Sequence, residues 1–120
     1  MSCVLRISSL GMEQAVSRTF VKPYRLENDT AHFTVSEAEF IDFAGQLNDA
    51  LSFLQTNAAD VRLLMSQPNA SGVLDFAIEY RAETFQSNAF PSALVQSAGV
   101  LGLALELSHY PGNEASRAAP

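Results

Sequence analysis

The sequence predicts an α+β fold, a two-layer sandwich in which helices pack on one face of a mostly antiparallel sheet. Several short segments alternate apolar and polar residues, which is typical of half-buried strands. Other segments repeat apolar residues every three or four positions, which predicts helices with one buried side. The second face of the predicted strands is polar, and a sheet with one wet face is usually antiparallel. Together these patterns indicate two layers around one core.

Size and composition fit a single domain. The chain has 120 residues, of which 48% are hydrophobic and 17% charged, and a chain of this length can bury a core without a metal or a disulfide. We expect one α+β domain over residues 1–110. Residues 111–120 are small and polar between two prolines, so we expect a flexible C-terminal tail there.

The N-terminal part is predicted to form a strand, a short helix and a strand pair. Pro23 favours extended backbone around it, and a polar turn separates the two strands of the pair. The predicted segments are a strand from Cys3, a helix within 9–20, an extended stretch over 22–26, a turn over 27–30 and a strand over 31–35.

A long helix over Ser36 to Thr56 is the clearest predicted element. Ser36 is expected to cap it, with Glu39 three residues later completing a capping box. Leu47 lies in the middle of the apolar stripe, so we expect it to be buried. The stripe consists of Phe40, Phe43, Ala44, Leu47, Leu51 and Leu54, and Gln46 falls on the wet side.

The C-terminal half is predicted to hold two helices and two strands. Asn57 can end the long helix and cap a short one, which Pro68 prevents from extending. Pro91 suits the start of the last helix and Gly102 its left-handed end. The predicted strands are 73–81, with Leu74, Phe76, Ile78 and Tyr80 facing the core, and 103–108, with Leu103, Leu105 and Leu107 facing it.

Charge and cysteine content exclude some functions. Acidic residues outnumber basic ones 13 to 7, for a net charge of -6, and the basic residues are scattered. We therefore expect neither nucleic acid nor an anionic membrane as a partner. Cys3 is the single cysteine, so no intrachain disulfide can form, and we expect a buried, inert thiol. The first apolar run is too short for a signal peptide or a membrane span, which favours the cytoplasm.

Several segments together resemble a family of small bacterial proteins catalogued as domain of unknown function four-two-seven-nine. The likeness covers roughly residues 3 to 111, and it implies an α+β bacterial domain with no assigned activity and no catalytic or binding residue to carry over. The segments are Pro23-Tyr24-Arg25, 45–50 followed by Phe53-Leu54, Asp75-Phe76, Phe90-Pro91, and 102–108 leading to Tyr110-Pro111.

Strand parity predicts one polar sheet face. We consider three interpretations: a solvated face with cross-strand ion pairs, a metal or acid–base site in which His32 lies among carboxylates, or a face that docks a second chain. We favour the first, because one histidine is too few ligands for most transition-metal sites. The candidate interaction face consists of Arg6, His32, Asp75, Glu79, Arg81 and Glu106.

The sequence contains no phosphate-binding, dinucleotide-binding, zinc-protease or nucleophile-elbow motif. We therefore predict no catalytic residue, no cofactor and no metal, and expect a protein-interaction module, inhibitor-like or immunity-like, with a basic protein partner. The alternative is a small hydrolase or metal-dependent enzyme that uses His32 and the sheet-face carboxylates. Two states of association stay open: a homodimer through a free sheet edge, because residues 4–8 and 103–108 contain no proline, and a monomer, which the net charge favours.

Overall fold

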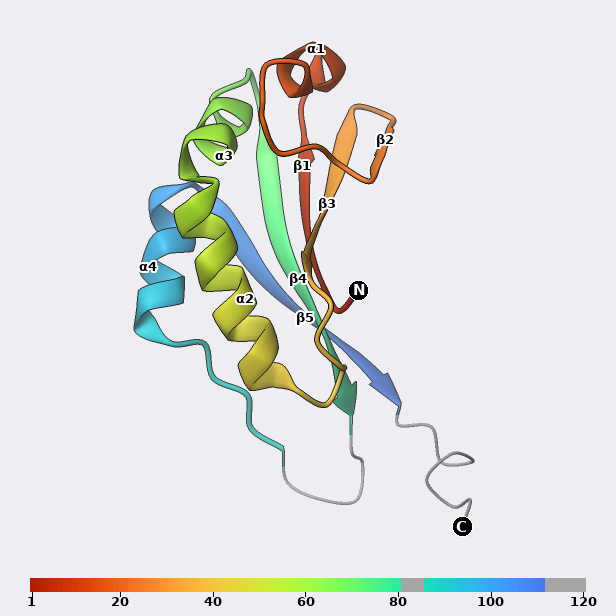
Figure 1. Ribbon diagram of the computed structural model, residues 1–120, viewed down its shortest axis with the longest axis vertical. Helices are drawn as coiled ribbons and strands as arrows, with labels where there is room; N and C mark the ends of the chain where they lie inside the picture. Colours follow the sequence, from red (N-terminus) through yellow and green to blue (C-terminus); the bar gives the residue numbers. More distant parts are fainter. Residues whose placement is uncertain (81–85, 112–120) are drawn as a thin grey trace.

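The computed structural model describes residues 1–80 and 86–111, and within them it places four helices and one five-stranded sheet (Figure 1). The predicted α+β fold is confirmed. The predicted tail, apart from Pro111 at the end of the last strand, lies outside the described residues. In chain order the elements are β1 (Cys3–Ser8), α1 (Met12–Val16), β2 (Arg25–Glu27), β3 (Thr30–Ser36), α2 (Phe43–Thr56), α3 (Ala58–Met65), β4 (Ser71–Tyr80), α4 (Ser92–Val100) and β5 (Leu103–Pro111).

The strands are ordered β2-β3-β1-β4-β5. Three of the four neighbouring pairs are antiparallel, as predicted, and β4 with β5 is parallel. The parallel pair arises because α4 carries the chain back to the starting end of β4, which a short hairpin could not do. Within the described residues β1 lies at the centre of the sheet, so only β2 and β5 form edges.

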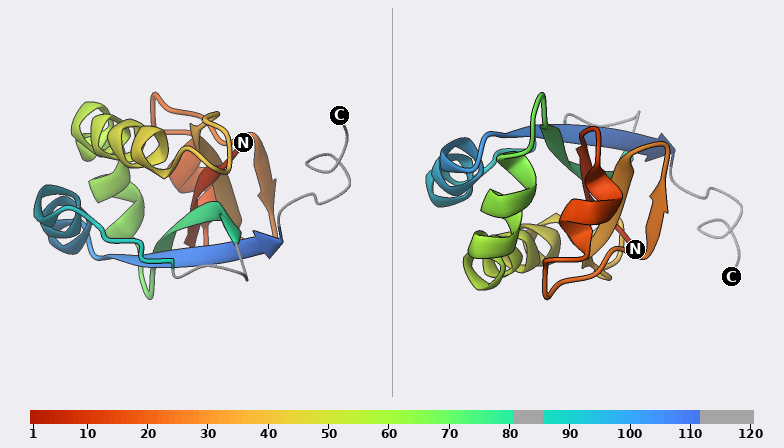
Figure 2. Two further views of the ribbon diagram at one scale, coloured as in Figure 1. Left: turned by 90° about the horizontal axis from the view of Figure 1, so that it is seen from below. Right: turned by 90° about the horizontal axis from the view of Figure 1, so that it is seen from above.

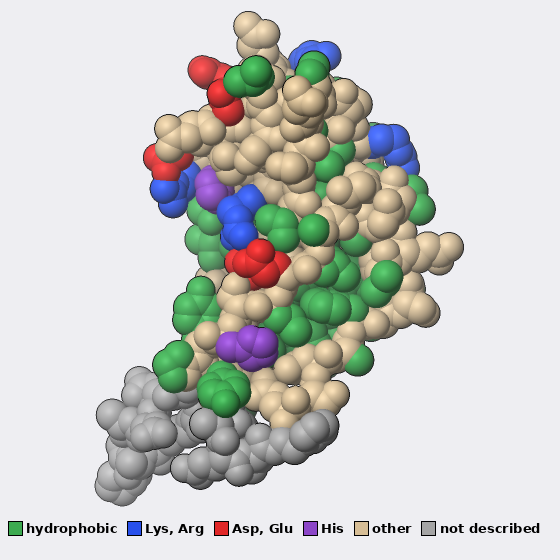
Figure 3. Space-filling model, turned by 180° about the vertical axis from the view of Figure 1, so that it is seen from behind, with side chains coloured by type: hydrophobic (Ala, Val, Ile, Leu, Met, Phe, Trp, Pro, Cys, Tyr) green, Lys and Arg blue, Asp and Glu red, His purple; other side chains and the backbone are tan. Residues whose placement is uncertain are grey.

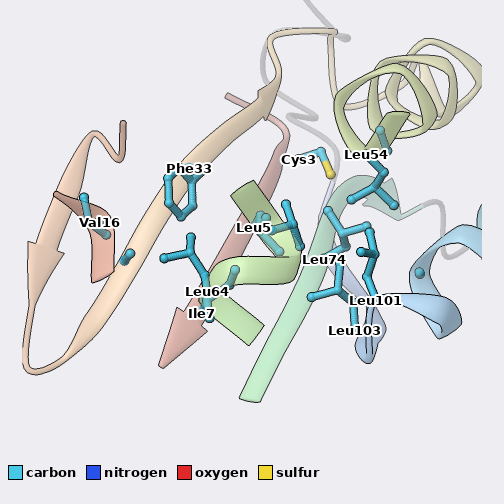
Figure 4. Packing of buried hydrophobic residues seen from close by; sticks show 14 of the residues in the cluster. Cys3, Leu5, Ile7, Val16, Phe33, Leu54, Leu64, Leu74, Leu101 and Leu103 are labelled. Atoms are coloured by element: carbon cyan, nitrogen blue, oxygen red, sulfur yellow. The ribbon is translucent and has the colours of Figure 1, made fainter. Parts of the chain in front are cut away.

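All four helices lie on one side of the strongly twisted sheet, which curls around them (Figure 2). The strand residues that face the helices follow the predicted alternation, except that Tyr80, expected in the core, is 46% exposed at the end of β4. Figure 4 shows side chains from strands and helices pointing toward one another in this core. Buried strand residues include Cys3, Leu5, Ile7, Ala31, Phe33, Leu74, Phe76, Ile78 and Leu103, and the helices add Met12, Ala15, Ala50, Leu54, Val61, Leu64, Leu94 and Ala98.

The start of the long helix differs from the prediction. Ser36 is the last residue of β3, and its hydroxyl donates to Asp49 at 2.6 Å instead of capping a helix. The helix begins after Asp42, whose carboxylate accepts the backbone N–H of Gly45 at 2.9 Å. The segment between them is not helical: the backbone N–H of Asp42 donates to the carbonyl of Glu39 in a turn, and the carbonyl of Phe40 accepts the backbone N–H of Glu79 on β4. The predicted capping box is therefore wrong.

The buried side of α2 is rotated from the predicted stripe. Gln46, expected on the wet side, is fully buried, and its Nε2 donates to the carbonyl of Ala77 at 2.9 Å. Leu47, expected in the core, is only half-buried. β1 begins at Cys3, opposite Phe76 on β4, so the strand pair does not extend to Ala77. Gln46 lies at this position and binds the carbonyl of Ala77. A buried amide with such a partner can replace an apolar residue.

Local turn chemistry explains the short connections. Asn28 and Asp29 both have positive φ, which matches the primed turn that joins two antiparallel strands. Gly102 has a φ of 77°, which confirms the predicted left-handed end of α4. Pro91 is the residue before the first turn of α4 rather than its first helical residue, since its ψ of 146° is extended.

Candidate functional site

Among residues 1–80 and 86–111, all helices lie on one face of the sheet, and Figure 3 shows the other face from behind. We call it the open face. Strand register places five of the six predicted interaction residues on it, and the sixth, Arg81, lies outside the described residues. The open face is formed by Val4, Arg6 and Ser8 of β1, His32 and Thr34 of β3, Val73, Asp75, Ala77 and Glu79 of β4, and Ala104, Glu106, Ser108 and Tyr110 of β5.

A charged network occupies the middle of the open face. Arg6 Nη1 lies 3.1 Å from Asp75 Oδ2, and Arg6 Nη2 lies 3.8 Å from Glu106 Oε1. The hydroxyl of Ser108 donates to the other oxygen of Asp75 at 2.7 Å. Both Asp75 oxygens are therefore engaged, and the ion pair is partly shielded from water, with side-chain exposures of 30% for Arg6 and 16% for Asp75. Three strands are thus tied together by side chains on this face.

His32 is placed next to arginines rather than among carboxylates. It pairs across the strands with Arg6 on β1 and with Arg25 on β2, and its ring lies 6.0 Å from that of Tyr24. Burial, together with the charges of Arg25 and Arg6, lowers the pKa of His32 below its ordinary value. The prediction that His32 lies among three carboxylates is wrong, because the strand order puts two arginines directly opposite it. Among the described residues, no group of three or more histidine, cysteine and acidic side chains could hold a metal ion.

An aromatic pair lies at the far end of the open face. The rings of Phe40 and Tyr110 are 5.5 Å apart, and Glu79 lies between these residues in the sheet. The backbone N–H of Glu79 donates to Phe40 at 3.2 Å, while Tyr110 is its parallel neighbour on β5. A pocket of about 340 Å³ opens here, lined by Glu39, Phe40, Ile41, Glu79, Tyr110 and Pro111.

Sequence reasoning missed this pocket. Phe40 fits the apolar stripe of the predicted helix, and this assignment placed it in the core. What places Phe40 at the pocket is its backbone hydrogen bond with Glu79 on β4, which lies 39 positions away in the sequence. A second pocket, of about 320 Å³, lies on the helical side between α2, α3 and α4, with Leu54, Arg62 and Val100 in its lining.

Cys3 is fully buried in β1 under the helices. Burial, followed by the nearby charges of Asp75 and Asp49, raises the pKa of the Cys3 thiol far above its ordinary value. The thiol is therefore held protonated, and a nucleophilic cysteine requires the opposite. The expected inert thiol fits this environment.

Comparison of the chain with protein-family models, with curated proteins and with solved structures finds no match. The resemblance to the uncharacterised bacterial family stays a prediction. Across residues 1–80 and 86–111, none of the helices combines the length and the apolar character needed to cross a membrane.

Proposed function

We propose that this protein is a protein-interaction module that binds a basic protein through the open face of its sheet. One observation carries the proposal: a sheet face that no helix of the described part of the chain covers bears a preformed charged network beside exposed aromatic side chains. Tyr24, at one end, is 47% exposed, and Tyr110, at the other, is 48% exposed. Aromatic residues and arginine are enriched in protein interfaces relative to other surfaces.

The network itself supports binding more than catalysis. Asp75 accepts from both Arg6 and Ser108, so its charge is already used within the sheet. A general base must lie within hydrogen-bond reach of the proton it takes, and at Asp75 a substrate would have to compete with Arg6 and Ser108. Glu106, by contrast, has a side chain that is 52% exposed, so it can still meet a cation of a partner. The Arg6–Asp75 pair fixes the geometry of the face, and the carboxylate of Glu106 is exposed to solvent.

Net charge indicates the kind of partner. The chain carries a net charge of -6, and complementary charge accelerates the encounter of two proteins and disfavours wrong partners. A basic partner protein therefore suits this surface. An inhibitor-like or immunity-like role agrees with a small acidic domain of this kind and with the resemblance to a bacterial family.

The proposal is tested by affinity capture from the source cells, with the partner identified and its charge determined. Glu106→Lys is the test variant, because its side chain is the most exposed of the charged network and Arg6 keeps its shorter contact to Asp75. Glu13→Lys, on the exposed side of α1, makes the same charge change away from the open face. We expect a basic partner that is retained by the wild type and by Glu13→Lys and is lost by Glu106→Lys.

Capture of no such partner, or equal loss with both reversals, would contradict the proposal. The alternative, a small hydrolase or metal-dependent enzyme that uses His32, predicts a different result. Purified protein would then contain stoichiometric zinc, nickel or manganese, which His32→Ala would remove. Elemental analysis of the two proteins distinguishes the proposals.

A further inference from the structure

The second pocket, which we call the helical pocket, lies where the helical layer changes direction. Asn57 caps both the end of α2 and the start of α3, and its φ of -110° is outside the helical range. α3 therefore departs from the line of α2, while α4 packs beside α2 (Figure 1). The pocket lies between the last turn of α2, residues 58–62 of α3 and residues 96–101 at the end of α4. Its volume of about 320 Å³ falls at the lower end of the range for small-molecule sites.

The deepest part of the helical pocket is apolar. Leu54 of α2 and Leu101 at the end of α4 are 1% and 7% exposed, so they connect the pocket to the core. Val100 adds an apolar wall that is 73% exposed. An apolar group bound against these three side chains would leave water, which is favourable.

The polar side chains of the helical pocket are not used by the fold. Arg62 is exposed on α3, and its guanidinium forms no ion pair or hydrogen bond within residues 1–80 and 86–111. In the same described part of the chain, the side chains of Gln55, Gln96 and Ser97 have no hydrogen-bond partner. A ligand can therefore bind these groups without displacing a contact within the protein.

Charge indicates the kind of ligand. Of the described residues that line the pocket, Arg62 alone is charged. Residues 84–105, which include all of α4, contain no charged residue. The carboxylate of Asp60, on the same helix as Arg62, is engaged by the backbone N–H groups of Phe20 and Val21. A single cation above an apolar surface matches an anion of one charge with an apolar body.

We propose that the helical pocket binds a small carboxylic acid with an apolar body. Arg62 takes the carboxylate, because a guanidinium donates two parallel N–H···O bonds to such a group. Leu54, Val100 and Leu101 take the apolar body. A phosphate ester fits less well, because its second negative charge has no cation to meet it. The pocket is on the helical side of the sheet, away from the open face, so this inference does not depend on the proposed function.

The test is an NMR titration of the full chain with octanoate, a straight-chain acid. Octanamide is the matched control, because it has nearly the same shape and no charge, and acetate carries the charge without the apolar body. We expect octanoate to shift the backbone amide signals of Gln55, Ala58, Arg62 and Val100 until they saturate, and both controls to bind more weakly. Equal binding of octanamide, or equal shifts on the open face, would overturn the assignment.

A matched pair of variants tests the role of the cation. Arg62→Gln should weaken binding of octanoate about two- to fivefold, the size of one exposed ion pair, and leave binding of octanamide unchanged. Arg18→Gln makes the same change at an exposed arginine outside the pocket and should leave both affinities unchanged. Wild-type affinity of Arg62→Gln for octanoate would contradict the role of the guanidinium.

A second pair of variants tests the place of binding. Ala58→Leu puts a larger side chain into the pocket, whereas Ala59, the next residue of α3, is exposed and outside the lining. Alanine and leucine are both good helix formers, so we expect both variants to fold, which their amide spectra show directly. Octanoate should no longer bind to Ala58→Leu and should bind to Ala59→Leu as to the wild type. Loss of binding in both variants, or in neither, would show that octanoate does not occupy the helical pocket.

Discussion

Asp60 and Phe20 are joined by a hydrogen bond that leaves the two side chains in opposite environments. The carboxylate of Asp60 is buried in α3 and accepts the backbone N–H groups of Phe20 at 2.9 Å and Val21 at 2.8 Å. The ring of Phe20 is 95% exposed. Asp60 lies in the first turn of α3, and its side chain holds a loop 40 positions away in the sequence.

We therefore expect Asp60→Ala to destabilise the protein much more than Phe20→Ala. The first change leaves two backbone N–H groups without their acceptor, which should lower the free energy of unfolding by about 1.5–3 kcal/mol. The second removes an exposed ring and should change it by less than about 0.5 kcal/mol. Urea denaturation measures both values, and similar values for the two variants would contradict the described contact.

The start of α2 makes a prediction about a pair of substitutions. A methyl group on Gly45 would lie 2.3 Å from Asp42 Oδ2, so Gly45→Ala should displace the capping carboxylate. Asp42→Ala alone should lower the free energy of unfolding by about 0.5–2 kcal/mol. In that background Gly45→Ala should stabilise the helix by up to about 1 kcal/mol, because alanine is the better helix former. In the wild type the loss of the Asp42 cap should cancel this gain in stability. Additive effects in a double-mutant cycle would show that Asp42 does not cap the helix.

Leu54 and Leu47 lie two turns apart on α2 and differ in burial. Leu54 is 1% exposed in the core, and Leu47 is half-buried at its margin. Leu54→Ala should lower the free energy of unfolding by about 2–5 kcal/mol, because it leaves a cavity. Leu47→Ala should cost clearly less, because water and neighbouring side chains can fill the space. Thermal or urea unfolding of both variants checks the order, and a larger loss at Leu47 would support the stripe predicted from sequence.

The buried thiol of Cys3 predicts a dependence of stability on pH. Burial raises the pKa of Cys3 in the folded state, while the unfolded thiol has a pKa of about 8.5. Above that pH the unfolded chain releases a proton that the folded chain retains, so stability is fully present below pH 8.5 and falls as the pH rises. The slope should approach about 1.4 kcal/mol per pH unit. Urea denaturation between pH 7.5 and 10 should show this component in the wild type and not in Cys3→Ala.

The edge position of β5 bears on the expected homodimer. β1, the other strand without proline that sequence offered as an edge, lies between β3 and β4 and cannot pair further. A dimer would therefore use β5, which has nine residues and only β4 as a strand neighbour among the described residues. Light scattering at two protein concentrations should show association. Hydrogen exchange should slow in β5 as concentration rises and stay unchanged in β2, the other edge. A monomer at both concentrations would contradict the expectation of a homodimer.

Much of the fold can be predicted because alternation along a strand is a local property. Cys3, Leu5 and Ile7 face the core for the same reason that Arg6 faces away, since successive side chains point to opposite faces. The polar face was therefore predicted residue by residue. Which of these residues lie side by side was not predicted, because the sequence does not state which strand lies beside which. Strand order alone put Arg6 between His32 and Asp75, and so turned an expected histidine–carboxylate cluster into an arginine-centred one.

The sequence by itself determined the class of fold, the alternation of buried residues along β1 and most of β3 and β4, and the acidic character that favours a basic partner. Tertiary structure decided where the long helix begins and what lies at the end of the open face. Residues 36–42 have a helical pattern, but Ser36 ends β3, a turn follows at residues 40 and 41, and a backbone bond from Glu79 to Phe40 ties this segment to β4. That bond brings Phe40 beside Tyr110 and leaves a strand carbonyl for Gln46 to bind. Such pairing depends on segments far apart in the chain, and a local pattern carries no information about it.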